Sequence, residues 1–86
     1  KQLDIAKKVF NLLKFTEKII KRDGLKEARI IVNDFFDQNK KINLDYFEII
    51  ESESFSFTQE FNSNYNYYAM IAVKIGGVRL IDNLKL

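Results

Sequence analysis

A glycine pair between two apolar runs constrains the fold of this chain more than any other feature. Residues 67–75 form one run, Gly76-Gly77 follows, and residues 78–84 form the other. Two apolar, β-branched segments joined by two glycines predict a β-hairpin, because glycine adopts the positive φ angles of tight turns at little cost. A two-residue turn also fixes the register and places Lys74 directly opposite Arg79.

The residues before the hairpin carry a helical period. Apolar residues recur at steps of three and four, which predicts an amphipathic helix from Gln2 to about Lys21 and a second that ends near Gln38 or Asn39. Between them, Gly24 suits the left-handed position past the end of a helix, and Asp23 is a candidate cap for the second helix. The short link favours an antiparallel helix pair.

From Leu44 the sequence pattern repeats every second residue instead of every three to four, which predicts a strand. Phe47 and Ile49 should point to one face and Tyr46, Glu48 and Ile50 to the other. Residues 52–66 predict a loop, with a short strand around Ser56 to Gln59. The apolar hairpin face, in which Val73 pairs with Leu80, should meet the helices.

These elements predict an α+β fold for a single domain, residues 1–86. Two helices pack on one face of a small antiparallel sheet of about three strands, which ends in the β-hairpin. The 86 residues are 47% hydrophobic, enough for one packed core.

Composition excludes several kinds of site. The chain has no Cys and no His, which removes thiolate chemistry and the commonest general base and metal ligand. No apolar run reaches the roughly 18 residues of a membrane span, and no signal-peptide pattern opens the chain, so a cytoplasmic location and no membrane partner are expected. The net charge of +2 gives little reason to expect nucleic acid. We assign no catalytic, cofactor-binding or metal residue.

Lys74 and Arg79 are candidates for ligand contact. Like charges that face each other across a ladder are unfavourable unless an anion or a carboxylate lies beside them. In the structural interpretation, which we favour, Glu48 on the neighbouring strand neutralises the pair. In the functional interpretation, the pair holds a phosphate or a substrate carboxylate.

Other polar residues have ordinary structural interpretations. Asp82 falls on the core face and should pair with backbone donors or a cation, and it and Asn83 are weak site candidates. A carboxylate metal site is disfavoured because Glu48 and Glu51 project to opposite faces, and Glu53 brings no His partner. The tyrosines resemble a base-stacking surface but more ordinarily pack at the core edge, and the lysines of the first helix form a solvated face. These tyrosines are Tyr65, Tyr67 and Tyr68.

The amino-acid sequence of the hairpin resembles the carboxyl-terminal sequence of the pantothenate synthetase (pantoate–β-alanine ligase) family. The resemblance rests on Lys74-Ile75-Gly76-Gly77 and on Arg79-Leu80-Ile81-Asp82-Asn83. Residues 43–51 are similar to the family's Asp-Tyr-apolar-Glu strand. The connector, residues 52–66, is rich in Ser and Asn and lacks the Asp-x-Glu-Thr-Leu motif expected from the family.

The resemblance implies the carboxyl-terminal lid domain of an ATP-dependent, AMP-forming ligase that condenses pantoate with β-alanine through pantoyl adenylate. The family's ATP-binding motifs lie in an amino-terminal Rossmann-like domain, so none of those residues maps onto this chain. ATP and Mg²⁺ are implied for the full enzyme, which is a homodimer in the family. The start at Lys1 and the resemblance together indicate an excised domain. Because the ATP-binding half, which also forms most of the family's dimer contact, would be missing, we expect the excised domain to be monomeric, without bound cofactor and inactive by itself.

One alternative belongs to a different functional class. A free-standing α+β module could bind RNA or a protein partner through its tyrosine-rich edge and the lysines of the first helix. A strongly salt-dependent affinity for single-stranded RNA would favour that interpretation.

Overall fold

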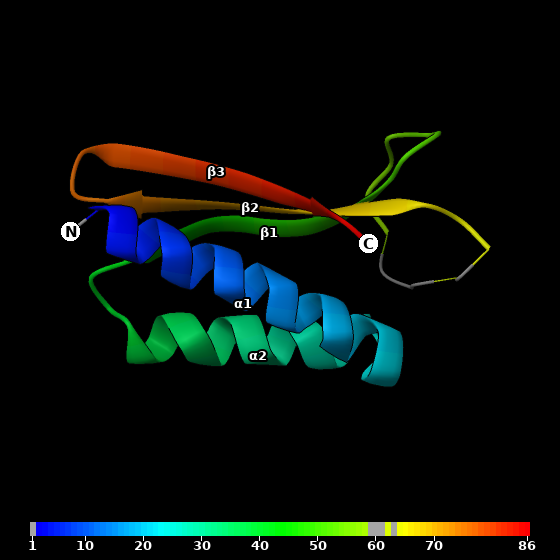
Figure 1. Cartoon of the computed structure of the whole chain (residues 1–86), viewed down its shortest axis with the longest axis horizontal. Helices are drawn as coiled ribbons and strands as arrows, with labels where there is room; N and C mark the ends of the chain where they lie inside the picture. Colours follow the sequence, from blue (N-terminus) through cyan, green and yellow to red (C-terminus); the bar gives the residue numbers. More distant parts are fainter. Residues whose placement is uncertain (1, 59–61, 63) are drawn as a thin grey trace.

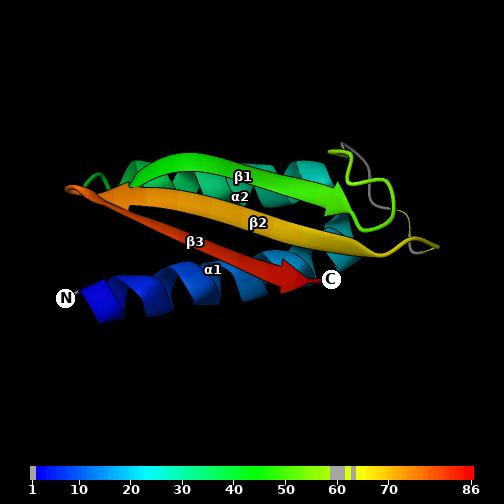
Figure 2. The same ribbon diagram turned by 90° about the horizontal axis from the view of Figure 1, so that it is seen from above.

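The computed structural model describes residues 2–58, 62 and 64–86. Along the chain, the described elements are α1 (Gln2–Asp23), α2 (Leu25–Gln38), β1 (Asn43–Glu51), β2 (Tyr67–Ile75) and β3 (Val78–Lys85). The strands form an antiparallel sheet in the order β1-β2-β3. Both helices cover one face of this sheet, α1 below β3 and α2 below β1 (Figures 1 and 2). The predicted α+β fold is confirmed.

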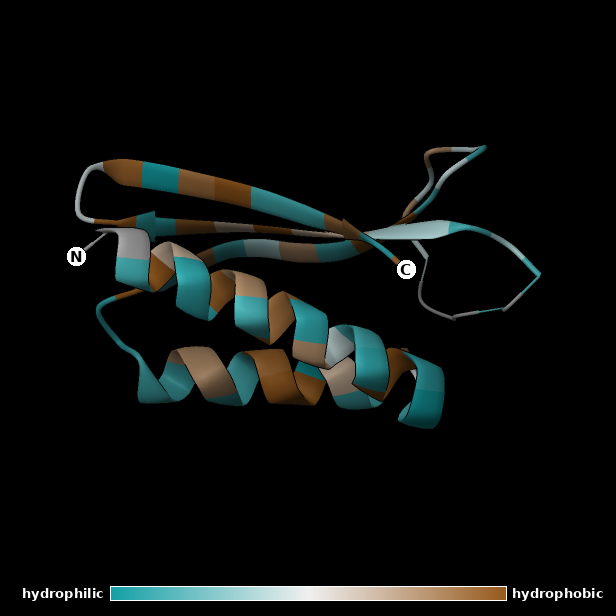
Figure 3. Cartoon of the chain, in the orientation of Figure 1, coloured by the Kyte–Doolittle hydropathy of each residue, from teal (hydrophilic) through white to brown (hydrophobic). Residues whose placement is uncertain are grey.

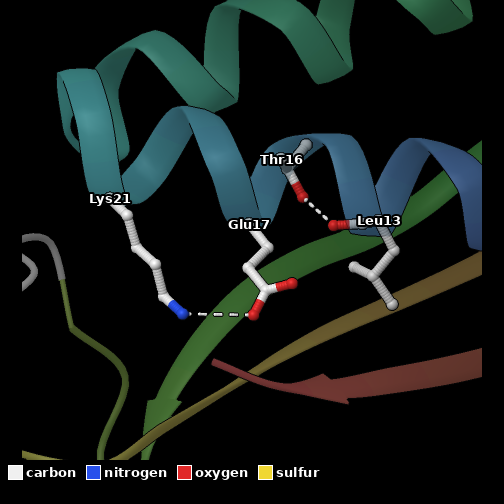
Figure 4. A network of polar contacts seen from close by, with 4 residues as sticks. All are labelled: Leu13, Thr16, Glu17 and Lys21. Atoms are coloured by element: carbon white, nitrogen blue, oxygen red, sulfur yellow. Dashed lines mark hydrogen bonds and ion pairs between the residues drawn. The ribbon is translucent and has the colours of Figure 1, made fainter.

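The core lies between the helices and the sheet. Alternate residues of β2 and the apolar stripes of both helices meet there, and Figure 3 shows bands of apolar and polar residues along both helices. Among the residues whose burial is described, Thr16 is the one polar residue buried in this core, and its hydroxyl donates to the carbonyl of Leu13 at 2.6 Å (Figure 4). This bond satisfies a hydroxyl that would otherwise be costly to bury. The fully buried large side chains are Leu13, Thr16, Ile20, Val32, Ile49, Ile71 and Val73.

A single residue, Gly24, links the two helices. Its N–H donates to the carbonyls of Ile19 at 3.2 Å and Ile20 at 3.0 Å, which ends α1. Its φ of 98° is positive, as predicted for the residue past the helix, but its ψ of 173° lies outside the left-handed helical region. This combination of angles is essentially restricted to glycine.

The prediction that Asp23 caps the second helix is wrong. Asp23 is the last residue of α1, and Gly24 occupies the N-cap of α2 without a side-chain hydrogen bond. The Asp23 carboxylate accepts instead from Nε of Arg22 at 2.9 Å. The turn is therefore formed by the backbone freedom of glycine and not by a capping side chain.

The hairpin has the predicted register. Ile75 pairs with Val78, Lys74 with Arg79 and Val73 with Leu80. Only Gly76 of the two turn glycines has a positive φ, 58°, which matches the pattern of a type II′ turn. The register of β1 on β2 shifts between Leu44 and Tyr46, so that Asp45 occupies a β-bulge.

The outer edge of β1 is covered. Arg29 of α2 donates from Nη1 to the carbonyl of Phe47 at 3.0 Å. Further along, the N–H of Thr58 donates to the carbonyl of Ile49 at 2.9 Å. The short strand predicted around residues 56–59 is a single bridge between Phe57 and Ile50, and its last residue lies outside the described residues. Backbone groups of an edge strand invite pairing with other chains unless they are covered in this way.

We expect Gly24→Ala to lower the free energy of unfolding by about 1–3 kcal/mol, because alanine is strained at these backbone angles. A Cβ at this position would meet no atom within 4 Å, so the loss reports the backbone alone. Urea denaturation followed by circular dichroism measures it. The matched control is Gly77→Ala, which also has open space but no positive φ. Equal losses for the two variants would contradict the assignment of strain to Gly24.

Candidate functional site on the open face of the sheet

The face of the sheet turned away from the helices is here called the open face. The register places on it the residues that alternate with the core positions of each strand. As predicted, Phe47 and Ile49 share one face of β1; it is the face turned to the helices, and both residues are buried there. The open face comprises Asn43, Tyr46, Glu48, Ile50, Tyr68, Met70, Ala72, Lys74, Arg79, Ile81, Asn83 and Lys85.

One end of the open face carries a charged group, the basic corner: Asp45, Tyr46, Lys74 and Arg79. Nη2 of Arg79 lies 2.8 Å from Oδ2 of Asp45, and its guanidinium carbon lies 5.8 Å from the centroid of the Tyr46 ring. Since Arg79 belongs to β3 and Asp45 to β1, the arginine side chain spans the central strand. The pair lies at the hairpin end of the sheet.

The prediction that Glu48 neutralises Lys74 and Arg79 is wrong. Oε1 of Glu48 lies 3.1 Å from Nη2 of Arg29, which reaches around the edge of β1 from α2. Asp45, and not Glu48, is the carboxylate that neutralises Arg79. Lys74 has no carboxylate partner among the described residues, so the basic corner keeps one uncompensated positive charge.

Sequence reasoning missed Asp45 because the bulge changes the alternation of β1. With a strict period of two, Leu44 and Tyr46 would share a face. Leu44 instead packs against the core while Tyr46 lies on the open face. The apolar character of Leu44, out of phase with Phe47, was the one signal of the bulge.

Two shallow grooves lie along the open face, and the first adjoins the basic corner through Tyr46. The first, of about 450 Å³, is lined by Tyr46, Glu48, Ile50, Phe57 and Met70. The second, of about 380 Å³, is lined by Ile50, Ser52, Phe55, Tyr68, Met70 and Asn83. Because Ile50 and Met70 line both grooves, the two form one continuous surface. Its apolar members Ile50, Phe55, Phe57 and Met70 are called the apolar patch.

The two phenylalanines of this patch belong to the predicted loop and are 78% and 65% exposed, for Phe55 and Phe57 respectively. A tight turn after β1 holds them. The Glu51 carboxylate accepts from the backbone N–H groups of Glu53 at 2.6 Å and Ser54 at 3.3 Å. These bonds stabilise the ionised carboxylate, the Glu53 N–H most, and lower the pKa of Glu51 below its usual value.

The other sequence candidates do not join the site. Asp82 faces the helices half-buried, as predicted, and accepts from the backbone N–H of Asn83 at 2.9 Å. Tyr67 is buried, whereas Tyr68 lies on the open face, so the tyrosines do not form one stacking surface. The described residues bring no three acidic, histidine or cysteine side chains together around a common point. Neither described helix is long and apolar enough to cross a membrane.

We expect Lys74→Glu to raise the free energy of unfolding of the 86-residue chain by about 0.2–1 kcal/mol, because it replaces a like-charge pair with Arg79 by an opposite-charge pair. Urea denaturation at low and high salt measures the gain, which should shrink as salt screens the charges. The control is Lys85→Glu, since Lys85 lies opposite Tyr68. A loss of stability specific to Lys74→Glu would show that Lys74 has a structural role.

Comparison with known proteins gives concordant matches. The family described as pantoate-beta-alanine ligase matches residues 1–85. The pantothenate synthetase of Flavobacterium psychrophilum is 30% identical over 81 residues, which cover 94% of this chain and 29% of that protein. The pantothenate synthetase of Cytophaga hutchinsonii is 30% identical over 82 residues, 93% of this chain and 29% of its own length.

A third relative, the pantothenate synthetase of Christiangramia forsetii, is 28% identical over 78 residues, 91% of this chain and 28% of its own length. The chain thus spans less than a third of the relatives that it matches. The family match covers nearly the whole chain and agrees with the resemblance found in the hairpin and in β1. The chain belongs to the pantoate–β-alanine ligase family.

Proposed function

We propose that residues 1–86 are the carboxyl-terminal lid domain of a pantothenate synthetase, the ATP-dependent ligase that joins pantoate to β-alanine with release of AMP and pyrophosphate. The observation that supports this most directly is the family match over residues 1–85. The relatives are about three times longer than the matched segment. An amino-terminal Rossmann-like domain of the same polypeptide is therefore the proposed partner, with ATP, pantoate and β-alanine as the substrates of the whole enzyme.

The chemistry of such a ligase explains the need for a lid. ATP activates the carboxylate of pantoate as an acyl adenylate, and the amine of β-alanine then attacks this mixed anhydride. Water competes with the amine for the same electrophile, so a cover that excludes water protects the intermediate. The domain contributes by orientation and charge, since it contains no His or Cys for acid–base or nucleophilic work.

The basic corner is the part of the domain best suited to meet a phosphate. Arg79 is held in place by Asp45 and by the Tyr46 ring, whereas Lys74 is exposed and without a carboxylate partner among the described residues. An ammonium group held over a phosphate stabilises negative charge that develops there. Tyr67 and Tyr68 begin β2 at the end of the sheet opposite the hairpin turn, so we assign phosphate contact to Lys74 and Arg79 (Figure 1).

Mg²⁺ accompanies ATP in the proposed enzyme. The described carboxylates do not gather into a cluster that would hold it, and those nearest the corner are engaged by Arg79 and Arg29. We therefore propose that the metal and the nucleotide bind to the amino-terminal domain. A cytoplasmic homodimer for the full enzyme is part of the same proposal.

A chimera tests the proposed function. This chain replaces the matched segment of the Flavobacterium psychrophilum enzyme, and pantothenate formation from ATP, pantoate and β-alanine is measured. We expect the chimera to be active, the relative truncated before that segment to be inactive, and the 86-residue chain alone to release no AMP. An inactive but folded chimera, or AMP release by the chain alone, would contradict the proposal.

The same chimera tests the role of the basic corner. We expect Lys74→Glu to lower kcat/KM by about tenfold or more, because a charge-assisted contact contributes about 1.5–3 kcal/mol. Lys85→Glu, on the same face but distant from the hairpin turn, is the matched control. Since Lys74→Glu removes a repulsion within the fold, lost activity would not reflect lost stability. Unchanged kinetics would remove Lys74 from the site.

A further inference from the structure

The side of the helix pair that faces away from the sheet is here called the helical face (Figure 1). A groove of about 520 Å³ runs along it between α1 and α2. Asn11, Leu12 and Phe15 of α1 and Phe35 and Gln38 of α2 line this groove. Phe15 is 49% exposed, although it is a large apolar residue. An exposed groove with an apolar lining is a candidate contact with another molecule.

The groove shows which residues of each helix share the helical face. Residues three, four or seven apart lie on the same side of an α-helix. Counted from Phe15 and Gln38 of the groove, this spacing defines one stripe on each helix. The stripe of α1 is Asn11, Phe15, Lys18 and Arg22, and the stripe of α2 is Glu27, Ile31, Asp34 and Gln38. Ile31 is partly buried, and the other members of both stripes are exposed.

The two stripes carry charges of opposite sign. The stripe of α1 contains Lys18 and Arg22 and no carboxylate, whereas the stripe of α2 contains Glu27 and Asp34 and no cation. Among the described residues, no ion pair engages Lys18, Glu27 or Asp34. Arg22 contacts Asp23, but its side chain is 72% exposed. The helical face thus presents a row of cations beside a row of anions, and the two rows do not neutralise each other within the chain.

A second copy of the chain is complementary to this arrangement. Two copies can meet face to face about a two-fold axis that lies in the plane of contact. If the axis runs along the helices, α1 of each copy lies on α2 of the other, and cations meet anions. If the axis runs across the helices, α1 lies on α1 and cations meet cations. Charge complementarity therefore selects the first arrangement, in which the four helices form a bundle.

The turn at Gly24 sets the height at which each residue meets the second copy. Because this one residue joins the helices, residues equally far from it in sequence lie at the same height, and rotation about an axis along the helices preserves that height. Lys18 is six residues from Gly24, whereas Glu27 and Asp34 are three and ten residues from it. Lys18 therefore lies between the two carboxylates of the second copy, about 5–6 Å from each along the helix axis.

We propose that the helical face binds a second copy of this chain, with α1 of each copy packed on α2 of the other. Phe15 lies at the centre of the contact, where each ring enters the groove of the other copy. Lys18, Glu27 and Asp34 form its charged rim. The proposal does not depend on the proposed function. A monomer was expected because the amino-terminal contact would be missing, whereas the helical face lies within residues 1–86.

The size of the helical face predicts a weak dimer. α2 has 14 residues and is about 21 Å long, and two neighbouring helices are about 20 Å wide. The contact therefore covers on the order of 400 Å² per copy, about half of what a standard protein interface buries. Because its rim is ionic and exposed, salt should weaken it further.

Other combinations of surface and occupant are less complementary. The carboxylates of Asp45 and Glu48 are engaged by Arg79 and Arg29, so the described open face has no free carboxylate to meet Lys74 of a second copy. A nucleic acid on the helical face would meet the carboxylates of α2 beside the cations of α1. Surfaces that bind nucleic acid present an extended basic stripe instead.

Charge reversal tests the proposal. Sedimentation velocity measures the dimer fraction of the 86-residue chain between about 10 µM and about 1 mM, the range in which a contact of this size populates both states. Lys18→Glu and Asp34→Lys each bring like charges together twice in a symmetric dimer, so each should raise the Kd about tenfold or more. The double variant restores opposite charges and should dimerise more tightly than either single variant.

The two single variants also separate a specific contact from an effect of net charge. Lys18→Glu lowers the net charge and Asp34→Lys raises it, so repulsion between whole molecules would change in opposite directions. Lys85→Glu is the matched control, because Lys85 lies on the open face. It changes the net charge as Lys18→Glu does and should leave the Kd unchanged.

A second pair of variants tests the centre of the contact. Phe15→Ser should leave the chain monomeric up to about 1 mM, because the apolar centre contributes most of the affinity of an interface. Phe55→Ser, which replaces a phenylalanine that is 78% exposed beside the open face, should not change the Kd. Circular dichroism and urea denaturation show that each variant is folded.

Several outcomes would overturn the proposal. One is a parent chain that stays monomeric up to about 1 mM. Another is a dimer that the Lys18 and Asp34 variants leave unchanged. A dimer lost in Phe55→Ser and kept in Phe15→Ser would assign the contact to the open face. A monomeric chain that binds a single-stranded RNA oligonucleotide, more tightly after Asp34→Lys, would assign the helical face to RNA.

Discussion

The register of the β2–β3 hairpin is the constraint on which the rest of the structure depends. Because side chains alternate along a strand, a slip of one residue would exchange the two faces of the sheet. The two-residue turn at Gly76-Gly77 prevents this slip. It directs Ile71 and Val73 into the core and leaves Lys74 and Arg79 side by side on the open face. The core and the basic corner are thus set by the same few backbone bonds.

Much of the fold could be predicted from sequence because the signals are local and periodic. Helical spacing indicated both helices, and the period of two from Leu44 indicated β1. The turn chemistry of the glycine pair gave the pairing of β2 with β3, including the contact of Lys74 with Arg79. These signals need no knowledge of which elements meet in space.

The parts that could not be predicted depend on tertiary geometry. Glu48 was expected to neutralise Lys74 and Arg79, but it forms an ion pair with Arg29, because the long arginine side chain on α2 reaches around the sheet edge. The bulge at Asp45 shifts the alternation of side chains between the two faces of β1 by one residue. A prediction that assumes strict alternation along the strand therefore misses it. Phe57 lies in a segment of loop composition, and only its bridge to Ile50 brings it to the apolar patch.

The lengths of the connections have a consequence for the order in which the molecule assembles. One residue joins α1 to α2, and two residues join β2 to β3, so each pair is a local structure with a small loop-closure cost. The pairing of β1 with β2, in contrast, must close the connector of residues 52–66. The helical hairpin and the β-hairpin are therefore the units that form early, and the closing of that connector sets the pace of folding. The same connector carries Phe55 and Phe57, so the pairing that closes it also positions two strongly exposed phenylalanines beside the sheet.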